Sequence, residues 1–96
     1  MTETLRELFE THNAQLIDVR TPGEFAAGPQ SAGPYAALNI PLQEFATRFP
    51  EIDAARPVIL VCAAGARSGQ ACGFLAQQGY ERVYNGVNLA TVARQL

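Results

Sequence analysis

The sequence has no lysine, one histidine and two cysteines, and each shortage narrows the possible functions. Two cysteines, Cys62 and Cys72, are too few for a disulfide framework. The sequence also lacks a C-x-x-C motif and paired histidines, so it shows no zinc-binding pattern and we expect no metal or other cofactor. All seven basic residues are arginine, which we interpret as a bias of composition rather than a functional signal.

The chain also lacks a long apolar run and a strong charge imbalance. No apolar stretch approaches the ~18–20 residues of a membrane span, and the N-terminus has no basic-then-apolar signal pattern. A net charge of −2 gives no electrostatic basis for binding nucleic acid or an anionic membrane. We therefore expect a cytoplasmic protein. Its 96 residues, 48% of them hydrophobic, predict one small domain, residues 1–96, with a modest core.

The most informative stretch runs from Val58 to Ser68. Four apolar residues, 58–61, are typical of a strand buried on both faces in a parallel sheet. Cys62 follows at the carboxyl end of this strand, where open α/β sheets bind ligands. Most of the next five residues are small, which lets the backbone curl around the cysteine: Ala63, Ala64, Gly65, Ala66 and Arg67.

Amide groups in such a curl, together with the start of the next helix, form an anion-binding concavity. The same field lowers the pKa of a thiol, so the pattern predicts that Cys62 is a nucleophile. The alternative is a buried core cysteine that simply ends a strand. Glycine and arginine follow at loop spacing where further core residues would be expected, which favours the nucleophile.

Several segments resemble the rhodanese family of sulfurtransferases. Residues 62–68, C-A-A-G-A-R-S, resemble the C-x-x-G-x-R-S active-site loop of single-domain rhodaneses. Residues 16–25, L-I-D-V-R-T-P-G-E-F, resemble the family's IDVR-x-x-x-E-[FY] segment, and residues 39–42 resemble its N-I-P segment. Residues 68–71 and 78–80 are similar to the small phage-shock type of rhodanese. Together these segments cover roughly residues 15–86 in the family's order.

The resemblance implies transfer of a sulfane sulfur through a persulfide on Cys62. The donor would be thiosulfate or a related small molecule, and the acceptor cyanide, a thiol or a protein cysteine. Residues 63–67 would form the substrate-binding loop, with Asp18, Arg20 and Ser68 in supporting positions. Many relatives carry a basic or polar side chain inside this loop. Alanine at 63, 64 and 66 weakens the case for thiosulfate itself and suits an open pocket that serves a protein partner.

Arg67 has two interpretations. Its guanidinium either steers an anionic donor or braces the loop by pairing with Asp18 or Glu24. We favour the pairing, because a planar guanidinium suits a buried carboxylate. We interpret Asp18 and Arg20, at the end of a predicted strand, as partners within the scaffold. Cys72 lies too far along the next helix for a disulfide with Cys62, and we expect it to fill the core.

Two other functions remain open. Cysteine-based phosphatases and arsenate reductases of the same fold resemble this chain, but their C-x-x-x-x-x-R loop has five intervening residues where this one has four, 63–66. A shorter loop suits a single transferred sulfur atom better than a phosphoryl group. The second alternative is a non-catalytic rhodanese-like binding module, against which the intact cysteine and loop argue.

Strands alternate with helices along the chain, which predicts an α/β fold with a small, doubly wound parallel sheet and helices on both faces. The family resemblance implies four strands in the order 38–40, 15–19, 58–61 and 82–84. Helices are predicted after Thr4, after the Thr21 capping box, over 42–49, from Ser68 to Gly79 and over 89–96. Residues 28–34 are predicted as a loop and 85–86 as a turn.

Overall fold

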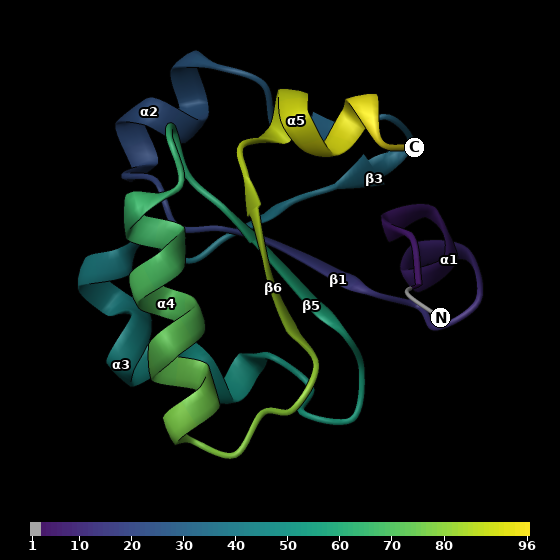
Figure 1. Ribbon diagram of the computed structural model, residues 1–96. Helices are drawn as coiled ribbons and strands as arrows, with labels where there is room; N and C mark the ends of the chain where they lie inside the picture. The colour runs from purple at the N-terminus through teal and green to yellow at the C-terminus, as the bar shows by residue number, and fades with distance from the viewer. Residues whose placement is uncertain (1–2) are drawn as a thin grey trace.

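A four-stranded parallel sheet forms the centre of the computed structural model, which describes residues 3–96 (Figure 1). The strand order is β4–β1–β5–β6, as the family resemblance implied. The four strands are β1 (Gln15–Asp18), β4 (Leu38–Asn39), β5 (Val58–Val61) and β6 (Val83–Val87). The parallel pairing aligns the carboxyl ends of β1 and β5 at one edge, with Asp18 opposite Val61. The predicted α/β class and topology are confirmed.

Within residues 3–96, five helices pack around the sheet, and three of them start where the sequence predicts: after Thr4, after Thr21 and at Leu89. Thr4 and Thr21 each accept a hydrogen bond from the backbone of a glutamate three residues later, and that glutamate's side chain bonds back, which completes two capping boxes. The helices are α1 (Leu5–Glu10), α2 (Pro22–Ala27), α3 (Phe45–Arg48), α4 (Ala66–Gln77) and α5 (Leu89–Arg94).

Strand β5 is buried on both faces and separates two apolar cores. Val58, Leu60 and Cys62 face the core beneath α3 and α4, whereas Ile59 and Val61 face the core beneath α1 and α5. This alternation follows from the period-two geometry of a strand. The predicted central strand is therefore confirmed, and it directs Cys62 toward the α4 side of the sheet.

The structure corrects the sequence prediction in four segments. Helix α4 begins at Ala66, before the predicted Ser68, because Gly65 adopts a φ of +99° and caps it. Residues 85–86 continue β6, since Gly86 packs closely under neighbouring strand and helix side chains. A short hairpin begins within the predicted loop and extends beyond it, formed by β2 (Ser31–Ala32) and β3 (Tyr35–Ala36). The predicted helix over 42–49 is divided, with 3-10 turns at Leu42–Glu44 and Phe49–Glu51 on either side of α3.

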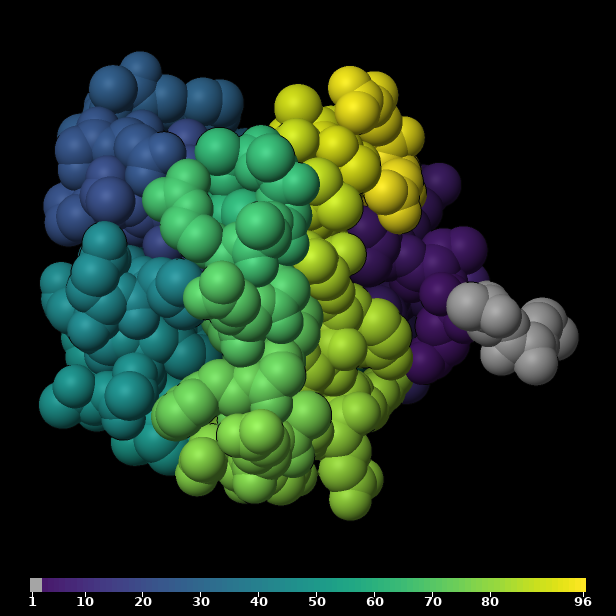
Figure 2. Space-filling view, turned by 60° about the vertical axis from the view of Figure 1, so that its left-hand side comes forward, coloured from purple at the N-terminus to yellow at the C-terminus, as the bar shows by residue number. Residues whose placement is uncertain are grey.

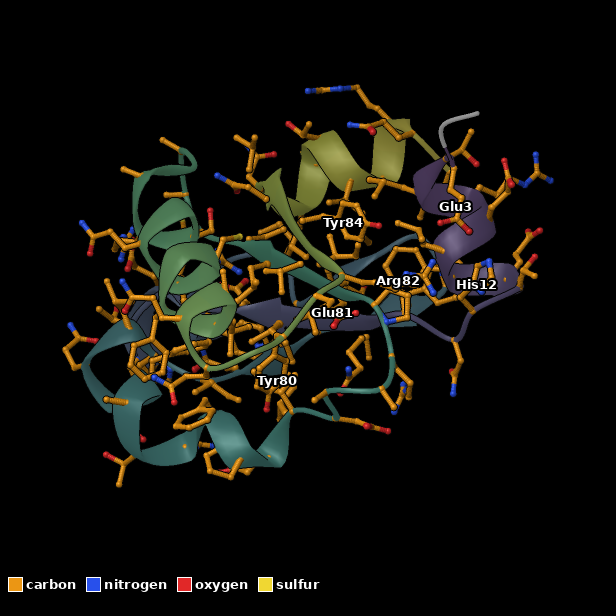
Figure 3. The ribbon with its side chains drawn as sticks, turned by 60° about the horizontal axis from the view of Figure 1, so that its bottom comes forward. Glu3, His12, Tyr80, Glu81, Arg82 and Tyr84 are labelled. Atoms are coloured by element: carbon orange, nitrogen blue, oxygen red, sulfur yellow. The ribbon has the colours of Figure 1, made fainter. Side chains whose placement is uncertain are left out.

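A polar cluster closes the opposite end of the sheet from Cys62. Glu3 contacts His12 at 2.6 Å and Arg82 at 2.8 Å, and Figure 3 shows the three side chains converging beside α1. Because His12 precedes β1 whereas Cys62 follows β5, parallel strands place them at opposite edges. Over residues 3–96, no helix combines the length and apolar character needed to cross a membrane. The same residues contain no group of three metal-ligating side chains.

Candidate active site

Cys62 lines a pocket of about 290 Å³ at the carboxyl edge of the sheet. The loop that carries it emerges between α2 on one side and the β6–α5 segment on the other (Figure 2). The cysteine itself is 3% exposed. Segments from four parts of the chain line the pocket: Arg20, Pro29, Cys62, Ala63, Asn88, Leu89 and Ala90.

The backbone after Cys62 curls back so that it donates to the sulfur. The Gly65 amide lies 2.9 Å from Cys62 Sγ, and Ser68 Oγ lies 3.3 Å away on the first turn of α4. This curl needs glycine, since a Cβ at Gly65 would sit 3.3 Å from Val87 Cγ1 and the φ of +99° strains any other residue. The Cys62 amide in turn donates to the Val87 carbonyl at 3.0 Å.

Opposing influences act on the pKa of Cys62, and the net result is a pKa below the ordinary value of a thiol. Burial raises the pKa, because it disfavours the charged form. Hydrogen bonds from the Ser68 hydroxyl and from the amides of Ser68, Gly65 and Ala64 lower it. Together these donors outweigh burial, which is what a nucleophilic thiolate requires.

Ser68 connects the cysteine loop to β6. It is fully buried, and its Oγ lies 2.7 Å from Asn85 Oδ1 and 3.2 Å from the Gly65 carbonyl. Asn85 Nδ2 donates to the same Gly65 carbonyl at 3.0 Å. Asn88 adds a bond from its Nδ2 to the Ala63 carbonyl at 3.3 Å. Asn85 in β6 and Asn88 just after it therefore brace the loop.

Arg67 pairs with Glu24 rather than with Asp18. Two bonds of 2.6 and 3.0 Å join its guanidinium to the Glu24 carboxylate, which links α4 to α2. The bonds from Arg67 hold the pKa of Glu24 at about 2. Of the two partners considered from the sequence, the structure selects Glu24.

Asp18 and Arg20 form a second pair at the end of β1. The Arg20 guanidinium donates to both Asp18 oxygens at 2.7–3.0 Å, and the Arg20 amide adds a bond of 2.9 Å. Asp18 is fully buried. Arg20 lines the pocket, so the charge it presents there is largely neutralised by the carboxylate beneath it. Asp18 itself is not one of the lining residues.

The structure brings the predicted site residues together, but in different positions. Cys62, Ala63 and Arg20 line the pocket, and Gly65 and Ser68 contact the sulfur. The other residues of the set do not line the pocket: Ala64, Ala66, Arg67 and Asp18. Sequence reasoning missed Asn85, Val87 and Asn88. The Asn85-Gly86 pair is a turn signal, so no pattern in the sequence indicated that this asparagine faces the loop.

Cys72 has a different environment, as the sequence predicted. It lies half-buried along α4 against the core that Cys62 also joins. Burial raises its pKa to about 11. Both cysteines are free thiols.

Known proteins resemble this chain over most of its length. Residues 1–86 match the rhodanese-like domain family. A sulfurtransferase of Allochromatium vinosum is 42% identical over 80 residues, which cover 83% of this chain and 71% of that protein. The thiosulfate sulfurtransferase GlpE of Actinobacillus pleuropneumoniae serotype 3 is 32% identical over 79 residues, covering 82% of this chain and 69% of that protein.

A solved rhodanese structure shares this fold. A structure titled "rhodanese with anions from E. coli" superposes with a TM-score of 0.59 at 36% identity, covering 79% of this chain and 87% of that one. The chain belongs to the rhodanese-like domain family, and its relatives include sulfurtransferases.

Proposed function

We propose that the protein is a sulfurtransferase that moves a sulfane sulfur, from thiosulfate or a related donor, through a persulfide on Cys62. The observation that supports this most directly is the Gly65 amide, which donates to Cys62 Sγ at 2.9 Å, together with the Ser68 hydroxyl, which lies 3.3 Å from the same atom. A sulfur so placed is held as a thiolate without a separate general base. Thiosulfate sulfurtransferase activity is the corresponding enzymatic assignment.

The reaction proceeds in two displacements at sulfur. The Cys62 thiolate attacks the outer sulfur of the donor, the donor's S–S bond breaks, and sulfite leaves with the bonding electron pair when the donor is thiosulfate. An acceptor thiolate or cyanide then attacks the outer sulfur of the persulfide. The Cys62 Sγ–S bond breaks, and the thiolate is regenerated. Converging amides of residues 63–68 stabilise the anionic sulfur in each state.

The pocket bears on the choice of donor and acceptor. Arg20, the charged residue among those lining the pocket, is already paired with Asp18. Arg67 is held by Glu24, and loop positions 63, 64 and 66 are alanine. The small divalent anion of thiosulfate would therefore depend on backbone amides for binding. A protein cysteine is the acceptor that an open, weakly charged pocket suits best. Two free cysteines fit the reducing cytoplasm, where we place the reaction.

Intact-protein mass spectrometry after incubation with thiosulfate tests the proposal. One added sulfur on the wild type, absent from Cys62→Ser and removed by cyanide, is the expected result. Cys72→Ser is the matched control and should load as the wild type does. A protein that takes up no sulfur from thiosulfate or from a small-molecule persulfide would contradict the proposal and favour a binding module.

A further inference from the structure

The Ser68 hydroxyl carries one hydrogen, and three acceptors lie within reach of it. Asn85 Oδ1 is 2.7 Å from Ser68 Oγ, the Gly65 carbonyl is 3.2 Å away, and Cys62 Sγ is 3.3 Å away. A hydroxyl donates one hydrogen bond at a time, although it accepts up to two. The position of this hydrogen therefore decides how Ser68 acts on the cysteine.

The orientation of the Asn85 amide is fixed by the backbone. The Val87 N–H donates to Asn85 Oδ1 at 3.0 Å, and Asn85 Nδ2 donates to the Gly65 carbonyl at 3.0 Å. Reversing the amide would place a donor against a donor and an acceptor against an acceptor. Atom Oδ1 thus faces Ser68 as an acceptor, and a contact of 2.7 Å between two oxygens requires Ser68 to donate.

When Cys62 is a neutral thiol, every donor and acceptor in this set of hydrogen bonds has a partner. Ser68 donates to Asn85, and the lone pairs of Ser68 Oγ accept from the Cys62 S–H. When Cys62 ionises, the thiol hydrogen is gone and the charged sulfur favours a further donor beside the Gly65 amide. Ser68 supplies it only by rotating its hydroxyl away from Asn85, so ionisation of Cys62 and the Ser68–Asn85 bond compete for one hydrogen.

We propose that Asn85 is a positioning residue for Cys62. Asn85 accepts the hydrogen bond of the Ser68 hydroxyl while the cysteine sulfur is uncharged, and the hydroxyl donates to Sγ instead when the sulfur is a thiolate. This deepens the proposed function. After sulfur uptake the charge lies on the outer sulfur, so the hydroxyl returns to Asn85 and no buried donor is left unpaired. No proton enters or leaves Ser68 in the cycle, because only its O–H bond rotates.

Two ion pairs lie at the segments that flank the cysteine loop, and in each pair the two charges are partners. Arg67 on α4 is paired with Glu24 on α2, and Arg20 is paired with Asp18 at the end of β1. From β6 and α5, the described residues nearest the pocket contribute asparagine and apolar side chains, with no charge. Substitution of Asn85 leaves both ion pairs intact, so a change in the titration of Cys62 reports on the hydroxyl.

The test is a double-mutant cycle on the pH dependence of Cys62 alkylation, with Cys72→Ser in every variant. Asn85→Ala should move the midpoint to lower pH, because the water that replaces this exposed side chain can donate as well as accept. At a pH below the midpoint, the thiolate fraction should rise roughly two- to tenfold, which corresponds to the net free energy of one hydrogen bond. In a Ser68→Ala background, Asn85→Ala should leave the midpoint unchanged.

Asn85→Asp provides a second test should the alanine variant fold poorly. It keeps the acceptor for Ser68 and for the Val87 amide, so the midpoint should rise, and by more with Ser68 present than with Ser68→Ala. Equal shifts in the two backgrounds, or a rise in the midpoint with Asn85→Ala, would overturn the proposal and leave Asn85 as a loop brace. The titration uses no sulfur donor, so its outcome is independent of whether sulfur transfer is found.

Discussion

Cys62 and Cys72 lie ten positions apart in one chain and border the same core, yet their thiols have opposite properties. The pKa of Cys72 rises to about 11, because burial disfavours the thiolate and no donor compensates. Cys62 is the less solvent-exposed of the two residues, yet its pKa is lowered by hydrogen bonds from Ser68 and nearby amides. Burial alone therefore does not decide the reactivity of a cysteine here, whereas the donors that converge on its sulfur do.

The strongest way to test this contrast is to remove each sulfur in turn. We expect Cys62→Ser to reduce sulfur transfer to cyanide to the uncatalysed rate, because a serine hydroxyl is not ionised at neutral pH. Cys72→Ser should keep most of the activity. The cyanide assay measures both variants, and equal losses would contradict the assignment of the nucleophile.

Alkylation rates of the two thiols in the wild type sharpen the contrast without any substitution. The Cys62 rate should inflect below the ~8.5 of a free thiol, whereas Cys72 should inflect near 11. At pH 7 the thiolate fractions then differ by more than about 100-fold. Peptide mass spectrometry separates the two sites. An inflection of Cys62 at or above the free-thiol value would remove the argument for a mechanism without a base.

Two glycines at opposite ends of α4 test whether the loop itself controls Cys62. Gly65 and Gly79 have φ values of +99° and +92°, so alanine at either should destabilise the fold by about 1–3 kcal/mol. Only Gly65→Ala should also raise the alkylation midpoint of Cys62, because it displaces the amide at 2.9 Å. Urea denaturation and alkylation measure the two effects, and a matching midpoint shift in Gly79→Ala would show that lost stability is the cause.

The smallest expected effect concerns the pair between Glu24 and Arg67. The pKa of Glu24 falls from 4.5 to about 2 on folding, so the pair contributes stability above pH 4.5 that is lost as the pH falls toward 2. Glu24→Gln should flatten this part of the stability profile, measured by urea denaturation at each pH. Glu51→Gln is the control, because the pKa of Glu51 is also lowered by an arginine, far from the loop. Loss of Cys62 reactivity in Glu24→Gln alone would indicate that the pair also holds the loop.

Much of the fold could be predicted because the local sequence signals and the pattern of buried residues indicate the same helices and strands. The unbroken apolar run 58–61 and the capping boxes at Thr4 and Thr21 each determine an element almost alone. The prediction was wrong where tertiary packing overrides a local signal. Asn85-Gly86 favours a turn, but the close packing of Gly86 beneath Val92 and Ile59 keeps it within β6.

In the candidate site, too, contacts between residues close in the sequence were predictable, whereas contacts between distant residues were not. The sequence placed Cys62, Gly65 and Ser68 together around the start of α4, because their spacing is local. It left two partners open for Arg67, since Glu24 lies 43 residues away and the choice depends on how α2 meets α4. Asn85 was missed altogether, because its role depends on the register between β5 and β6, which shifts at residues 60–61.

The attachment of Cys62 to β5 limits how far this cysteine can move during the proposed sulfur transfer. The strand behind it is fully buried, and the cysteine's own amide is bonded to Val87, so this backbone opens only with the most stable part of the molecule. In the proposed mechanism, a persulfide on Cys62 would therefore travel no farther than its own side chain allows. A protein acceptor would have to bring its thiol to the pocket, which would require an extended or protruding segment on that partner.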